Sequence, residues 1–267
     1  MIRSMASATR VVLLSISLSQ GIFSTLPAWA QETPATPGLT IFPSEVVSPG
    51  TLQLEVGTSY SNTDSGKGLH MGRTLLRYGV GPVELRVEPG SYVVHWGGED
   101  YHGFEDLRLG MKATLFHSAG GRVLIGGQGT MSVPTGIADL TAGDPELQLS
   151  TAADFLLGDM LFLSTVVDWH SRYFGGDESW TMTLFPGLAI PSLSGGAGLG
   201  WSGHIDDGSL ESTLLVGLFI GLGQDTALEV SSGRNLETRD PLFFGIRVFR
   251  LLTRLDNTRP PRLLLDS

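Results

Sequence analysis

The 267-residue sequence contains no cysteine, and only 16% of its residues are charged. The lack of cysteine excludes a disulfide framework and any metal site built from thiolates, so stability must come from backbone pairing and packing. Acidic residues outnumber basic ones and give a formal net charge of -10. An acidic chain repels the phosphates of nucleic acids, so we expect no nucleic-acid partner.

Long apolar runs are also missing downstream of residue 30. A membrane-spanning helix needs about 20 mainly apolar residues, whereas the longest candidate, Leu214 to Leu222, is short and contains two glycines. No window of about a dozen residues keeps apolar residues at i, i+3 and i+4 without an interior glycine or proline. These absences exclude a helical inner-membrane transporter and leave an all-β protein, either soluble or embedded in an outer membrane.

The first 30 residues have the features of a secretory signal peptide. Arg3 and Arg10 precede the apolar stretch Val11 to Leu18, and Ala28-Trp29-Ala30 supplies a small-x-small cleavage site. We expect cleavage after Ala30 and export across the inner membrane. Residues 31–50 are rich in proline, threonine and serine, which predicts an extended periplasmic leader without a fold of its own.

Residues 51–252 alternate between apolar and polar side chains with the two-residue period of β-strands. The segment Val83 to Glu88, VELRVE, is an example in which three apolar residues alternate with three charged ones. We count about twelve such segments, joined by short and long connections in turn. This pattern is typical of a transmembrane antiparallel up-and-down β-barrel in the bacterial outer membrane, and it predicts an all-β fold followed by a C-terminal tail at residues 253–267.

Strand length separates the membrane barrel from a soluble β-sandwich. Segments of about 10 to 13 residues are longer than a sandwich needs, and they match the roughly 9–11 residues with which a tilted strand crosses a bilayer. Aromatic residues lie near many segment ends, but this position suits a lipid interface and a soluble core equally well. Because long connections face outward in such barrels, we expect both chain ends in the periplasm.

Three stretches carry a resemblance to a known family: LLRYGV at Leu75 to Val80, VELR at Val83 to Arg86, and GFEDLRLGMK at Gly103 to Lys112. In these stretches the chain resembles the MetA-pathway phenol-degradation family of transporter-like outer-membrane barrels. The resemblance implies a barrel and suggests uptake of aromatic or other small hydrophobic compounds. The sequence departs from the common barrel pattern at its end, where the tail Thr253 to Ser267 follows the last strand instead of a terminal aromatic residue.

The polar faces of the predicted strands supply the side chains that we expect to line the barrel interior. Charges of both signs are mixed on neighbouring strands, which predicts either a narrow polar path for a solute or a closed interior held by ion pairs. A barrel of about twelve strands lies between small filled barrels and wide channels, so its size leaves both alternatives open. The inward set comprises Glu55, Arg73, Arg77, Glu84, Arg86, Glu88, Asp106, Arg108, Lys112, Gln128, Glu146, Gln148, Asp154, Asp168, His170, Glu229 and Arg247.

An outer-membrane hydrolase is the alternative function with the most specific candidates. Asp168 and His170 share one strand face, and a carboxylate beside an imidazole can prepare a general base. No G-x-S-x-G motif occurs, however, and side chains at i and i+2 of one strand point in parallel without converging. We therefore expect no enzyme activity, no metal site and no cofactor. A structural or adhesive barrel with a closed interior is the other alternative.

The sequence as a whole predicts a monomeric outer-membrane channel or transporter-like barrel that takes up small hydrophobic or aromatic compounds. Uptake would be passive, because the sequence contains no nucleotide-binding motif. The expected partners are the lipid bilayer, lipopolysaccharide, the barrel-assembly machinery and a small-molecule solute.

Overall fold

A computed structural model of the chain describes residues 44–254, apart from 64–65, 99, 139, 142, 173–177, 207, 223–225 and 238–241. The predicted signal peptide at residues 1–30, the first part of the predicted leader and nearly all of the predicted tail lie outside the described residues. No helix in the part of the chain that the structure describes is long and apolar enough to cross a membrane.

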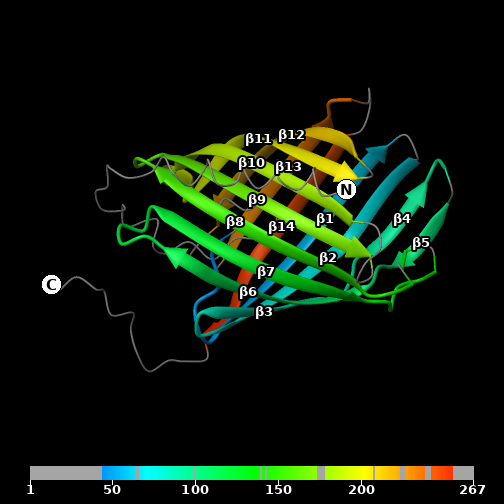
Figure 1. The fold of residues 1–267 in the computed structure, drawn as a ribbon, viewed down its shortest axis with the longest axis horizontal. Helices are drawn as coiled ribbons and strands as arrows, with labels where there is room; N and C mark the ends of the chain where they lie inside the picture. Colours follow the sequence, from blue (N-terminus) through cyan, green and yellow to red (C-terminus); the bar gives the residue numbers. More distant parts are fainter. Residues whose placement is uncertain are drawn as a thin grey trace, which may run out of the picture.

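The described chain forms a single antiparallel sheet that closes on itself (Figure 1). The first strand pairs with the second on one side and with the last on the other, which joins the two edges of the sheet. The strands are β1 (Thr51–Thr63), β2 (Gly66–Val80), β3 (Val83–Glu88), β4 (Tyr92–Trp96), β5 (Tyr101–Phe104), β6 (Leu107–His117), β7 (Val123–Val133), β8 (Glu146–Leu157), β9 (Leu161–Arg172), β10 (Glu178–Ile190), β11 (Gly195–Asp206), β12 (Ser209–Gly221), β13 (Thr226–Asn235) and β14 (Leu242–Arg254), with one 3-10 turn, η2 (Pro191–Leu193), between β10 and β11.

Two strands of the barrel wall are interrupted near their middle. β3 and β4 follow one another along β2, while β6 and β5 pair with β3 and β4 in an unchanged register. At the interruption Pro89 has no N–H for the ladder, and Gly90 has a positive φ of 86°. A Cβ on Gly90 would lie 2.5 Å from the carbonyl oxygen of Glu105, so only glycine fits. β3 and β4 together make one wall strand, and β5 and β6 make another. The wall therefore has twelve strands, which confirms the predicted fold.

The outer surface of the wall is apolar on every side. Such a continuous exposed apolar surface is unfavourable in water and matches the lipid-facing band of a membrane barrel. The predicted alternation of faces is confirmed, since neighbours of these residues along each strand point into the lumen. Exposed apolar residues on the wall include Val56, Leu85, Met111, Met131, Leu149, Met182, Leu199, Val216, Ile246 and Val248.

Part of the lumen is filled by an apolar cluster with residues from β9, β10, β12, β13 and β14. Glycines on β10 and β11 leave the space for its aromatic rings. A Cβ on Gly198 would lie 2.5 Å from Cε1 of Phe185, and a Cβ on Gly187 would overlap the ring of Phe162. This cluster was not predicted from the sequence, because apolar residues on the inward face do not stand out from those on the outward face. The buried members are Phe162, Phe185, Leu215, Phe219, Ala227 and Phe249.

We expect Met111→Arg to lower the free energy of unfolding by about 2–4 kcal/mol, the cost of a cation facing lipid near the bilayer midplane. Met111 lies near the middle of β6 and is 60% exposed. Leu157→Arg, at the end of β8 with 56% exposure, is the matched control and should cost only about 0–1 kcal/mol. Denaturant titration of both variants in lipid vesicles checks the difference, and equal costs would contradict the position of the lipid-facing band.

Candidate solute-binding lumen

The two ends of the barrel differ in their connections. Short connections such as Gly81–Pro82 and Gly158–Met160 lie at the end where β1 begins and β14 finishes, which we call the turn end. The connection Pro134–Pro145 lies at the opposite end, the loop end. In bacterial outer-membrane barrels the short turns face the periplasm and the long loops face outward.

Residues Ser44 to Gly50, the described part of the leader, lie inside the turn end of the lumen. The backbone N–H of Ser44 donates to Asp154 Oδ2 at 2.9 Å, and that of Val47 donates to Glu84 Oε2 at 2.9 Å. The hydroxyl of Ser44 donates to the same Asp154 oxygen. The described end of the predicted leader therefore makes contacts inside the lumen that the sequence did not indicate, and the extent of the leader at residues 31–50 stays a prediction. The leader folds inward because its backbone N–H groups supply donors for lumen carboxylates that are buried away from water.

A network of buried charges surrounds this segment. The guanidinium of Arg77 donates from Nε to Glu84 Oε1 at 2.7 Å and from Nη2 to Glu84 Oε2 at 2.6 Å, which is a bidentate pair. Its Nη1 donates to Glu55 Oε1 at 3.2 Å, and Arg86 Nη1 donates to Glu84 Oε1 at 3.2 Å. Arg77 and Glu84 are fully buried. Charges so deeply buried are tolerated only when they are paired in this way.

Glu45 connects the leader to the cationic side of the network. Its carbonyl oxygen accepts from Arg77 Nη2 at 3.3 Å and from Lys112 Nζ. Burial raises the pKa of the Glu45 carboxyl to about 7, although the charges of Lys112 and Arg77 oppose this change. The leader thus lies among the cations Arg77, Arg86 and Lys112 and the carboxylates of Glu55, Glu84 and Asp154.

Two glycines of the wall give the leader its space. A Cβ on Gly79 would lie 2.6 Å from the carbonyl oxygen of Val47, and a Cβ on Gly126 would lie 2.6 Å from that of Ser44. Gly79 also accepts a hydrogen bond from the N–H of Gly50 at 2.9 Å. Sequence reasoning assigned no function to these glycines, because nothing near them in the sequence indicates the segment that packs on them.

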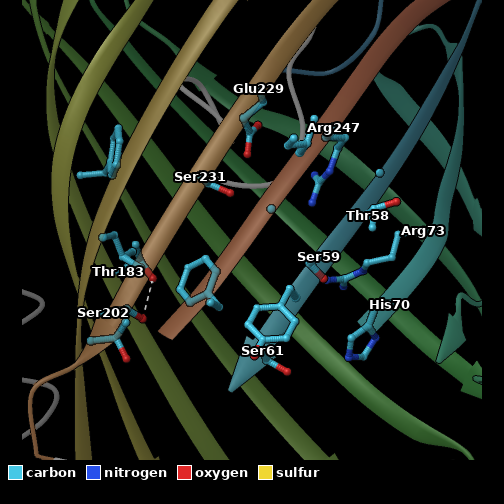
Figure 2. Close-up of a pocket in the computed structure, with 18 of the residues that line it drawn as sticks. Thr58, Ser59, Ser61, His70, Arg73, Thr183, Ser202, Glu229, Ser231 and Arg247 are labelled. Atoms are coloured by element: carbon cyan, nitrogen blue, oxygen red, sulfur yellow. Dashed lines mark hydrogen bonds between the residues drawn. The ribbon is translucent and has the colours of Figure 1, made fainter. Parts of the chain in front are cut away.

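Two cavities lie in the lumen. The outer chamber has a volume of about 550 Å³ and is lined by apolar side chains such as Phe185, Leu215 and Phe243. Hydroxyl groups line it as well, among them those of Thr183, Ser202 and Ser231 (Figure 2). Two of these hydroxyls, Thr183 Oγ1 and Ser202 Oγ, are 3.1 Å apart and hydrogen-bonded. The inner chamber, about 320 Å³, lies between the outer chamber and the leader. Both chambers are lined by Arg73, Val166, Asp168 and Arg247, which therefore mark their junction.

Most residues of the predicted inward set lie around these chambers. Glu229 borders the outer chamber, while Arg77, Glu84 and Asp154 lie beneath the inner chamber, against the leader. Their role as a solute path stays a prediction. The members of the predicted inward set that line the inner chamber are Glu55, Arg73, Arg86, Glu88, Arg108, Lys112, Gln128, Gln148, Asp168 and Arg247.

Asp106 holds a loop and lines neither chamber. Its carboxylate accepts from the N–H groups of Thr135 at 2.9 Å and Gly136 at 2.8 Å, and from the hydroxyl of Thr141 at 3.1 Å. These contacts fold the connection after β7 against the wall beside β5. Asp106 therefore differs from the rest of the predicted set, because three donors of one loop already surround it.

Asp168 and His170, the candidate general-base pair, have separate partners. Asp168 accepts from Gln148 Nε2 at 3.3 Å and from the hydroxyl of Ser150. His170 Nε2 lies 3.3 Å from Glu146 Oε2. Both side chains thus interact across to β8 and not with each other, as expected for i and i+2 positions of one strand. The predicted pair of Asp168 and His170 is therefore not formed, and the imidazole lies beside Glu146 instead.

A family model described as "Putative MetA-pathway of phenol degradation" matches residues 37–250. The chain belongs to this family. This confirms the resemblance seen in the stretches between Leu75 and Lys112, and it extends the relationship over nearly the whole barrel. No curated protein matches the sequence.

Solved structures of outer-membrane channels share the fold of this family member. The COG4313 outer membrane channel from Pseudomonas putida F1 superimposes with a TM-score of 0.63 at 16% identity, covering 78% of this chain and 98% of that one. The NanC porin gives a TM-score of 0.53 at 8% identity, and the KdgM porin 0.51 at 11%; each covers 74% of this chain and 98% of its own. At these identities the likeness shows the fold alone.

We expect Gly79→Ala to increase the ion conductance of the barrel while leaving the wall intact. The new methyl group would overlap the carbonyl oxygens of Val47 and Ser48, so the leader must leave its position. Gly129→Ala in β7 is the control, because its methyl group would meet Leu149 at an ordinary 3.5 Å. Single-channel recordings of both variants in planar bilayers test the prediction; an unchanged conductance in Gly79→Ala would show that the leader does not obstruct the lumen.

Arg77→Met should lower the free energy of unfolding by about 3–5 kcal/mol, because it leaves Glu84 and Glu55 buried without their main cation. The double variant Arg77→Met/Glu84→Gln removes the charge that has lost its partner and should recover part of the loss. Denaturant titration of the two variants provides the measurement. A double variant with a lower free energy of unfolding than Arg77→Met would contradict the prediction. The loss in Arg77→Met would then not come from the broken ion pair.

Proposed function

We propose that the protein is a bacterial outer-membrane channel for the passive uptake of small hydrophobic or aromatic compounds. The observation that carries the proposal is the outer chamber of about 550 Å³, which lies inside a closed barrel and combines aromatic and aliphatic side chains with hydroxyl groups. Sites for small organic ligands are concave and mostly apolar, with a few placed polar groups. A cavity of roughly 150 Å³ is enough for benzene in another protein, so one aromatic ring fits here.

Export by a cleaved signal peptide and insertion by the barrel-assembly machinery belong to the same proposal. The apolar outer surface supports a position in a bilayer, with lipopolysaccharide on the outer side. The closed sheet has no free edge through which a second barrel would pair, which supports a monomer. Passive transport, without enzyme activity, is supported by the fold shared with channels and by the separate partners of Asp168 and His170.

The leader determines how a solute would leave the outer chamber. It occupies the turn end, where its backbone bonds to Glu84 and Asp154, so the direct way to the periplasm is narrow. Only a few residues of the leader, Ser44, Glu45 and Val47, make these contacts, and they lie at the end of a segment that contains several prolines. We propose that a solute passes when this segment moves aside, and the wall itself remains closed.

We expect phenol to interrupt the ion current through the barrel in planar bilayers, whereas glucose at the same concentration leaves it unchanged. The chamber offers a ring apolar contacts that a sugar cannot use. Phe243→Ser should weaken the effect of phenol about tenfold, since Phe243 lines the outer chamber. Phe244→Ser is the matched control, because Phe244 is the next residue and faces outward with 42% exposure. Equal effects of phenol on both variants would refute the chamber as its binding place.

A further inference from the structure

Two arginines of neighbouring strands lie on either side of a glycine at the junction of the chambers. In β1, Gly57 is the register partner of Arg73 in β2 and also of Arg247 in β14. Adjacent strands lie about 4.8 Å apart, so the two arginine backbones are separated by roughly 10 Å. Gly57 has no side chain to fill the space between them. Figure 2 shows both side chains extending into the cavity over β1.

These two arginines differ from Arg77 and Arg86 in their partners. Arg77 and Arg86 form ion pairs with Glu84, but no residue that the structure describes forms an ion pair or a hydrogen bond with Arg73 or Arg247. Glu229 is the register partner of Arg247 across β13 and β14. The guanidinium donors at the junction are therefore available to a ligand.

The opposite wall carries a charge of the other sign. Asp168 lies on β9, which is six strands from β1 in the twelve-stranded ring and therefore across the lumen. Its carboxylate is held by Gln148 and Ser150, two neutral partners that leave its charge in place. A solute that passes from one chamber to the other thus crosses between two cations and one anion. A charge pair of this kind orients a polar solute, because one end of the solute is attracted to each wall.

We propose that Arg73 and Arg247 bind the carboxylate of a small aromatic acid, with its ring in the outer chamber against Leu215 and Phe243. The proposal rests on the proposed function and specifies its solute. A guanidinium presents a planar fork of N–H donors that matches a carboxylate, and charge-assisted bonds of this type are about twice as strong as neutral ones. Two guanidiniums that share one carboxylate also lose their mutual repulsion when it binds. A neutral solute of the same size offers no such gain.

The inner chamber favours the same sign of charge. Its cationic lining residues are Arg73, Arg86, Arg108, Lys112 and Arg247, whereas its acidic ones are Glu55, Glu88 and Asp168. Although the chain as a whole is acidic, cationic residues outnumber acidic ones in the lining of the inner chamber. An aromatic acid that has passed Arg73 and Arg247 meets a favourable potential on its way toward the leader.

Equilibrium dialysis of the full-length barrel tests the proposal. One ligand is labelled benzoate, and the other is labelled benzyl alcohol, a neutral analogue of similar size. We expect benzoate to bind more tightly than benzyl alcohol, and the double variant Arg73→Gln/Arg247→Gln to lose that preference, with benzoate affinity falling at least about tenfold. Arg250→Gln is the matched control, because Arg250 lies three residues further along β14 and faces outward. Heat-dependent migration on gels confirms that each variant is folded.

The outcomes separate this proposal from the proposed function. If phenol interrupts the current but benzoate and benzyl alcohol bind equally in the unmodified barrel, the carboxylate site is refuted and the channel stands. If no current is ever interrupted while benzoate binding depends on Arg73 and Arg247, the site stands and the channel is refuted. Acetate that binds as tightly as benzoate would also overturn the assignment, since the ring would then contribute nothing.

Discussion

Closure of the hydrogen-bonded sheet between β1 and its two neighbours is the constraint on which the rest of this structure depends. In hydrocarbon each backbone N–H and C=O needs a partner within the protein, and a ring of strands supplies all of them without a free edge. Once the ring is closed, the two-residue period of a strand sends every second side chain into lipid and the others into the lumen. Charged residues near the middle of the wall can then lie only inside, where water is scarce.

The cost of burying those charges explains the position of the leader. Glu84 and Asp154 are fully buried, and a carboxylate in such a place needs hydrogen-bond donors as well as a cation. Ser44 and Val47 supply backbone donors, and Arg77 supplies the cation. The leader is therefore part of the charge balance of the barrel, and the same contacts that stabilise the lumen also obstruct its turn end.

The fold was predictable from the sequence to the extent that it depends on local periodicity. Alternation such as that in Val83 to Glu88 identified the strands, their number and the inward direction of the charged side chains. The interruption at Pro89 and Gly90 was not predicted, because the strand pattern continues on both sides of it in the same register. The contact of Ser44 with Asp154 joins residues 110 positions apart and leaves no periodic trace in either segment.

Selectivity in such a lumen depends on which charges remain unpaired, and the net charge of the chain is a poor guide to it. The protein carries a formal charge of -10, yet the buried carboxylates of Glu55 and Glu84 are paired with Arg77, and Glu84 is also paired with Arg86. Pairing cancels these charges within a few ångströms, so they contribute little to the potential at a distance. Arg73 and Arg247 form no such pairs among the described residues, and a glycine separates them. A solute at the junction therefore meets two guanidiniums without ion-pair partners, with Asp168 on the opposite wall.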